Sequence, residues 1–170
     1  MLEISFYSDY DKPEYLPAIR EYQNIWISEG LRVVVTLEAK TGFQFIENKI
    51  NAIIYEGVSQ SHPLSLRASY DLDTKKSTIV HELLHRLLLG NKVVPFSKDR
   101  KEQSLISHKQ IDLVLYDIWT ELYGEEFAQK SMVVESARTE MYKEAWEWAM
   151  QFDKDERKVR FEKSITERKL

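Results

Sequence analysis

The first apolar pattern in the chain is that of a helix with one buried stripe. Between about residues 12 and 29, apolar side chains recur at intervals of three and four positions, namely Tyr15, Leu16, Ile19, Tyr22, Ile25 and Trp26. This spacing places them on one helix face. Because Pro13 suits a first turn and Gly30 suits a helix end, the pattern predicts a leading helix.

Three later segments have the composition of strands. Leu31–Thr36 is short and β-branched, and Gly42–Tyr55 contains aromatic and β-branched stretches around a turn at Asn48-Lys49. Leu64–Tyr70 alternates apolar and polar positions, which is typical of a half-exposed strand or an edge strand. We therefore expect a small sheet in the first half of the chain.

A second helical pattern follows directly. It runs from Asp73 or Thr74 to Leu89, beginning at a residue of the capping type and ending at Gly90 and Asn91. The segment predicts one helix, Thr74–Leu89, with several leucines available for burial.

The next segment predicts an exposed connector and then another helix. Residues 91–103 contain Pro95 and a polar cluster that cannot supply a core face, which favours a long loop that acts as a lid. A helical pattern resumes near Ser104 or Ser107 and ends at Gly124. Residues 125–152 then predict one long helix. The basic tail, residues 154–170, predicts a surface helix or a frayed end.

The composition excludes several classes of site. The chain has 170 residues, a formal net charge of −4 and no cysteine, so any metal must be bound by His and carboxylate groups. The mild acidity argues against a nucleic-acid-binding protein. No stretch approaches the roughly 20 apolar residues of a membrane span, and the first ten residues lack a signal-peptide pattern. We therefore expect a soluble, cytosolic protein.

One motif within the helix Thr74–Leu89 has the chemistry of a metal site. In His81-Glu82-Leu83-Leu84-His85, the two histidines are four residues apart, so both imidazoles project from one helix face and can bind one metal ion. Glu82 can take a proton from a water at that metal and later pass it to a leaving amine. A shuffled chain of this composition would contain the pattern in roughly one case in a hundred.

A catalytic zinc normally has three protein ligands, and the sequence offers more than one third ligand. His108 follows the connector, and Asp112 lies one turn later, placed to accept a hydrogen bond from a ligand imidazole. This shared spacing favours His108. Asp112 itself and Glu121 are the alternatives, while His62 precedes Pro63 and is expected to be a loop residue.

The motif His81-Glu-Leu-Leu-His85 resembles the HExxH signature of the zincin metallopeptidases. By this resemblance, His81 and His85 are zinc ligands and Glu82 is the general base. Gluzincins have a Glu ligand with an Asp one turn later. The segment His108-Lys-Gln-Ile-Asp112 has the same spacing with His as the ligand, which is closer to a SprT-like arrangement.

The resemblance also implies a fold and a place for the substrate. We expect an α+β zincin-like domain, residues 1–124, with a small mixed sheet and an active-site helix, and a helical C-terminal extension, residues 125–170, packed on it. Zincins pair an extended substrate with an edge strand, and Leu64–Tyr70 is positioned for that role. Arg67 and Tyr116 are candidates for stabilising the oxyanion of the transition state.

The sequence thus predicts a zinc-dependent peptidase that acts on peptides or proteins, with Zn²⁺ held by His81, His85 and His108 and water activated by Glu82. Two alternatives remain open. One is a non-catalytic, zinc-stabilised interaction or regulatory domain whose metal is closed off by a fourth ligand such as Asp112. The other is a SprT-like protease associated with DNA.

Overall fold

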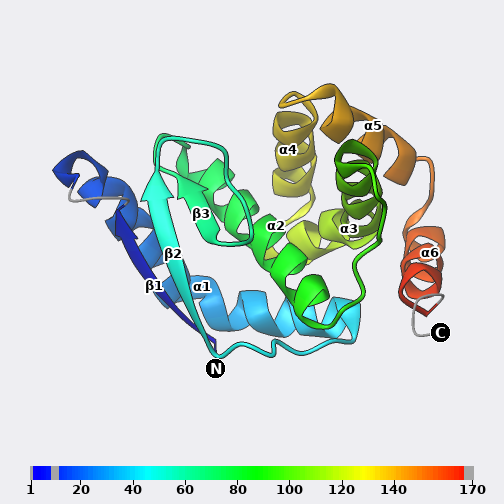
Figure 1. The fold of residues 1–170 in the computed structure, drawn as a ribbon, viewed down its shortest axis with the longest axis horizontal. Helices are drawn as coiled ribbons and strands as arrows, with labels where there is room; N and C mark the ends of the chain where they lie inside the picture. The colour runs from blue at the N-terminus through cyan, green and yellow to red at the C-terminus, as the bar shows by residue number, and fades with distance from the viewer. Residues whose placement is uncertain (1, 9–11, 167–170) are drawn as a thin grey trace. The chain divides into compact units, whose positions relative to one another are not determined.

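The computed structural model describes residues 2–8 and 12–166, and Figure 1 shows its fold. The fold is α+β, mostly helical with one small sheet, and the chain divides into two compact units, residues 1–91 and 92–170. The elements of unit 1 are β1 (Glu3–Ser8), η1 (Pro13–Tyr15), α1 (Leu16–Thr41), β2 (Lys49–Tyr55), β3 (Leu64–Arg67) and α2 (Leu72–Gly90). Those of unit 2 are α3 (Arg100–Tyr123), α4 (Glu125–Ser136), α5 (Glu140–Ala149) and α6 (Lys154–Thr166).

The sheet of unit 1 has the strand order β1-β2-β3, and both neighbouring pairs are parallel. Along β2, the side chains of Ile50, Ala52 and Ile54 are buried, whereas Lys49 and Asn51 are exposed. α1 and α2 pack against the sheet and against each other, so they cover the apolar face (Figure 1). The prediction of a mixed sheet is wrong for these strands, because α1 crosses over between β1 and β2 and returns the chain in the same direction.

Helix α1 is longer than the sequence pattern predicts. The segment Leu31–Thr36, predicted as a strand, lies inside the helix. Its buried side chains Val33 and Leu37 continue the stripe of the first turns, so burial outweighs the strand preference of β-branched residues. Gly30, predicted to end the helix, lies inside it, and a side chain would not fit there because a Cβ would lie 2.8 Å from the ring of Trp26.

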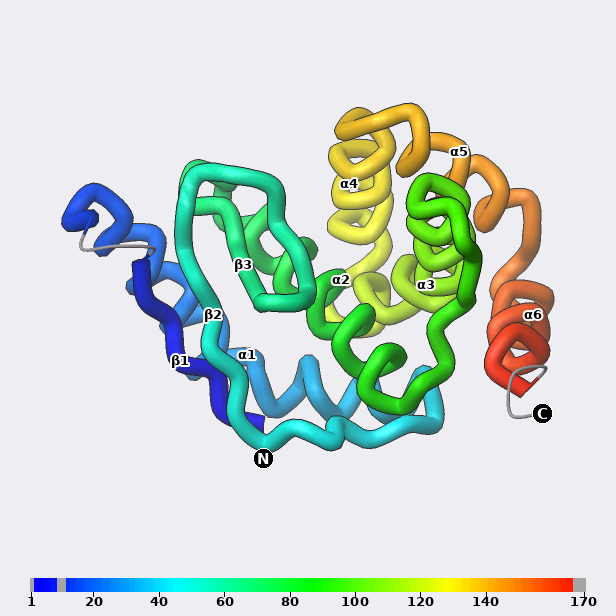
Figure 2. The backbone as a smooth tube through the Cα atoms, viewed as in Figure 1, coloured from blue at the N-terminus to red at the C-terminus, as the bar shows by residue number. Residues whose placement is uncertain are grey.

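The outer edge of β3 is already occupied. After β2 the chain turns and runs back beside β3 (Figure 2), where Gln60 forms an antiparallel bridge with Ser65 through two backbone hydrogen bonds of 2.9 and 3.0 Å. The Arg67 N–H donates to Ser59 Oγ at 3.2 Å. β3 is an edge strand of the sheet, as predicted, but it is almost fully buried rather than half-exposed and ends at Arg67 instead of Tyr70. Ser65 has no outer backbone group left for a peptide.

Unit 2 is built around α3, which contacts α4, α5 and α6. The rings of Trp119 on α3 and Trp146 on α5 stack with centroids 5.6 Å apart, and both side chains are buried. Arg157 on α6 forms a bidentate ion pair with Asp117, with Nη2 at 2.9 and 3.0 Å from the two carboxylate oxygens. These contacts explain why the basic tail forms a docked helix rather than a frayed end.

Two helix boundaries in unit 2 differ from the sequence prediction. α3 begins at Arg100 instead of near Ser104, because Asp99 accepts hydrogen bonds from the first free N–H groups. The single helix predicted for residues 125–152 is two helices, since Thr139 caps the start of α5. The last four residues of the predicted tail, 167–170, lie outside the described residues.

None of the helices in the described part of the chain contains a stretch long and apolar enough to cross a membrane. The division into a catalytic domain of residues 1–124 and an extension of residues 125–170 stays a prediction.

Candidate metal centre

Helix α2 brings His81 and His85 together as the sequence predicts. Asp71 caps the helix by accepting a hydrogen bond of 2.7 Å from the Thr74 N–H, and the helix then runs without interruption to Gly90. The two imidazole rings lie with centroids 4.9 Å apart, and their ligand nitrogens are within 4.8 Å of each other. Two nitrogens on one tetrahedral zinc are about 3.3 Å apart, because each Zn–N bond is about 2.0–2.1 Å. Small rotations of the two side chains therefore suffice for both to bind one ion.

The burial of this face suits a metal site. The His81 side chain is 1% exposed and Glu82 is 4% exposed, while His85 is only partly buried. An ionised carboxylate in such a place needs a cation or a hydrogen-bond donor. Glu82 follows His81 directly in sequence, so it is the carboxylate of α2 that is nearest along the chain to the histidine pair.

A buried arginine holds the end of this helix segment in place. Arg86 follows His85, and its Nη2 lies 2.6 and 2.7 Å from the two carboxylate oxygens of Glu47, while its Nη1 donates to the Ser61 carbonyl at 2.5 Å. The loop before β2 and the loop before β3 are thereby tied to α2. This clamp fixes the orientation of the turn that contains His85.

His108 lies on α3 of unit 2, and a backbone carbonyl holds one of its ring nitrogens. Its side chain is 8% exposed, and its Nδ1–H donates to the Ser104 carbonyl, one turn earlier, at 2.7 Å. The ring of Tyr142 packs edge-on against the imidazole at a centroid distance of 4.6 Å. Because the proton is on Nδ1, a neutral ring offers its Nε2 lone pair to a metal.

Asp112 follows one turn later on α3 and is fully buried. Neither of its carboxylate oxygens has a hydrogen-bond partner among residues 2–8 and 12–166. Burial, and then the negative charge of Glu135, raise the pKa of Asp112 well above its ordinary value. Asp112 therefore does not accept the predicted hydrogen bond from His108, because the Nδ1–H of His108 donates to the Ser104 carbonyl instead. Glu121, the other alternative ligand, is exposed.

The residues predicted to stabilise an oxyanion have other partners. The Tyr116 hydroxyl donates to Glu125 at 2.5 Å, and burial together with this bond raises the pKa of Tyr116 to about 12. The Nε of Arg67 donates to Glu56 at 2.6 Å. Both interactions are structural, and the sequence could not show them because the partners lie on other elements.

The fourth histidine, His62, lies in an exposed loop, as the sequence predicts. Partial burial and then the positive charge of Arg86 lower the pKa of His62. His62 does not belong to the group of side chains that could hold a metal ion among the described residues.

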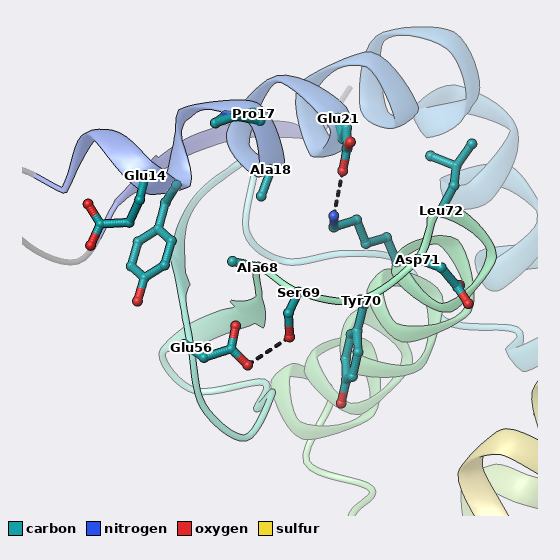
Figure 3. Close-up of a pocket in the computed structure, with 12 residues that line it drawn as sticks. Glu14, Pro17, Ala18, Glu21, Glu56, Ala68, Ser69, Tyr70, Asp71 and Leu72 are labelled. Carbon is teal, nitrogen blue, oxygen red and sulfur yellow. Dashed lines mark hydrogen bonds and ion pairs between the residues drawn. The ribbon is translucent and has the colours of Figure 1, made fainter.

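A pocket of about 470 Å³ lies at the carboxyl ends of the strands, and sequence reasoning missed it (Figure 3). Three of its carboxylates, those of Glu21, Glu56 and Asp71, are already engaged. Buried Lys75 is 2.5 Å from Glu21, and a hydrogen bond from Ser69 holds the pKa of Glu56 below its usual value. Asp71 caps α2. The side chains that line the pocket therefore join α1, α2 and the strand ends. The only one of them that a local sequence pattern could have indicated is Asp71, the capping residue before α2.

No family model, curated protein or solved structure matches this chain. The residues of the site themselves are therefore the basis for assigning a function.

Proposed function

We propose that this chain is a zinc-dependent peptidase with a zincin-like arrangement of its active site. The observation that carries the proposal is the pair His81 and His85 on one buried helix face, with ligand nitrogens within 4.8 Å and Glu82 between them. Two imidazoles on one helix face can bind a zinc ion that keeps one position open to water, and a buried carboxylate beside them can act as the general base.

The third ligand in this proposal is His108. Its hydrogen bond to Ser104 leaves Nε2 as the metal-binding atom, and its burial keeps competing water away. In this proposal each of the three histidines would contribute one ring nitrogen to the zinc.

The chemistry follows from these donors. Zinc, when bound, would supply a Lewis acid that polarises the scissile carbonyl and acidifies an attacking water. Glu82 takes the proton of that water and transfers it to the leaving nitrogen. The low exposure of Glu82 excludes bulk water from the transfer.

Replacing Glu82 by Gln tests this mechanism. Zinc-loaded wild-type protein is expected to cleave fluorescein-labelled casein, an unfolded protein. E82Q should keep its zinc but lose turnover by about 10²- to 10⁴-fold, the usual contribution of a general acid–base group. The matched control is E14Q, which changes an exposed carboxylate of unit 1 and should leave turnover unchanged. Wild-type turnover in E82Q would contradict the mechanism.

A closed, non-catalytic zinc site is the second candidate, and the carboxylate of Asp112 without a hydrogen-bond partner is the observation that favours it. If Asp112 is a fourth ligand, D112N should lose zinc even at saturating zinc, and the wild-type protein should not cleave casein. If the site is open, D112N should still bind one zinc at saturation, with an affinity about 10- to 100-fold lower at most.

A further inference from the structure

A second cavity of about 320 Å³ lies within unit 2, between α3, α5 and α6. This volume is near the lower end of the roughly 300–1,000 Å³ typical of small-molecule sites. It fits a ligand of one ring system with a short substituent. The residues used below, all of which line this α3–α6 pocket, are Lys109, Gln110, Leu113, Trp148, Arg160 and Lys163.

The charge of the α3–α6 pocket is opposite to that of the chain. Lys109, Arg160 and Lys163 line it and no carboxylate does, although the whole chain has a net charge of −4. Lys109 is 2.7 Å from Glu144, a side chain that is 57% exposed and turned to solvent. The Arg160 guanidinium lies over the ring of Phe152 at 3.6 Å, and no carboxylate in the described part of the chain pairs with it. An anion is the charge that complements this wall.

The remaining surface of the pocket is apolar and aromatic. Leu113 forms a buried part of the wall, and Trp148 supplies a ring that Phe152 holds edge-on at a centroid distance of 5.3 Å. Lys109 Nζ lies over the same ring, 6.0 Å from its centroid, so the aromatic surface and a cation stand side by side. The pocket therefore combines an apolar wall with cations.

Gln110 joins the elements that form this wall. Its side chain is 4% exposed, and its Nε2 donates to the Val93 carbonyl and to Ser164 Oγ, both at 3.1 Å. These two hydrogen bonds tie α3 to α6 and to the segment that precedes α3, so they hold the wall of the pocket in place.

We propose that the α3–α6 pocket binds a small organic anion with a flat apolar body. The ring packs against Trp148 and Leu113, and the carboxylate or phosphate contacts Arg160, Lys163 and Lys109. This inference goes beyond the peptidase proposal and does not depend on zinc, because the whole pocket belongs to unit 2.

Titration of the full-length protein with charged and uncharged versions of the same ring tests the proposal. The probes are AMP against adenosine and indole-3-acetate against indole-3-acetamide. The readout is the indole N–H signal of Trp148 in ¹⁵N NMR spectra, assigned with W148F. At least one anion should shift this signal saturably below about 1 mM, and its neutral analogue should bind at least tenfold more weakly. Tighter binding of AMP identifies phosphate as the anion, and tighter binding of indole-3-acetate identifies carboxylate.

Charge-matched variants of α6 complete the test. R160Q/K163Q removes two cations of the pocket and should weaken binding of the preferred anion by tenfold or more. The control K154Q/K158Q removes two exposed cations of the same helix that do not line the pocket, and it should bind as the wild type does. Equal weakening in both variants, equal binding of charged and neutral probes, or no shift of Trp148 at 5 mM would overturn the proposal. The comparison of neutral and charged probes uses wild-type protein, so it decides the question even if a variant fails to fold.

Discussion

Replacing Glu47 by Ala should destabilise unit 1 far more than the loss of a half-exposed glutamate ordinarily does. Glu47 is 45% exposed, but its partner Arg86 is only 7% exposed. Without Glu47, the buried guanidinium keeps a hydrogen bond to the Ser61 carbonyl but has no counter-charge. The cost therefore comes from the partner that stays behind, not from the residue that is removed.

The exposure of the two partners sets the magnitude. Removing one partner of a fully buried pair costs about 3–5 kcal/mol. Because Glu47 is half-exposed, water screens part of its charge, and we expect about 2–3 kcal/mol for E47A. R86M leaves a glutamate that can rehydrate, so we expect at most the same loss. The double variant should lose about 1–2 kcal/mol less than the sum of the two single variants, since the pair interaction is removed only once.

Urea unfolding followed by ¹⁹F NMR of fluorotryptophan-labelled protein measures this effect within unit 1, because Trp26 is its one tryptophan. The control is E3A, which removes an ion pair to Lys49 of 3.5 Å whose partners are 64% and 77% exposed. That variant should stay within about 0.5 kcal/mol of the wild type. A loss in E47A no larger than that in E3A would refute the reasoning.

Three further predictions concern single residues. G30A should lower the melting temperature despite the higher helix propensity of Ala, because its Cβ would lie 2.8 Å from the Trp26 ring; a rise in melting temperature would contradict this. Y116F should cost about 1 kcal/mol in urea unfolding, through loss of the bond to Glu125, and leave kcat for casein unchanged; a fall in kcat would instead place the hydroxyl in the reaction. D112N should be more stable than the wild type in zinc-free protein at neutral pH. Burial raises the folded-state pKa of Asp112 above its unfolded value of about 3.9, so the wild type loses stability as pH rises through the folded-state pKa. The melting temperature of D112N should therefore exceed that of the wild type above about pH 4, by a margin that grows with pH. A margin that does not change with pH would contradict this prediction.

The sequence predicted elements whose ends are marked by local chemistry. Helix α2 is the clearest case, since a capping residue precedes it and a glycine ends it, and its ends lie within two residues of the prediction. The strand preference of Leu31–Thr36 misled the prediction because burial of Val33 and Leu37 decides the conformation there. The break before α5 has a local signal in Thr139, but the apolar spacing continues across it and hid the boundary.

In the candidate site, too, the contacts within one helix could be predicted and the contacts between distant segments could not. The pairing of His81 with His85 could be predicted because one helical turn fixes it, and the hydrogen bond from His108 to Ser104 has the same i−4 spacing. The partners of Tyr116 and Arg67 could not be predicted, because Glu125 and Glu56 lie on other elements. Whether His108 completes the site stays a prediction.

The zinc content of the purified protein, measured by elemental analysis, tests the central proposal most directly. The account predicts about one zinc per chain in the wild type and in H62A, which changes the one histidine outside the site. It predicts a large loss of zinc in H85A and in H108A. A wild-type protein that takes up no zinc when zinc is added, or an H85A variant that holds as much zinc as the wild type, would contradict the account.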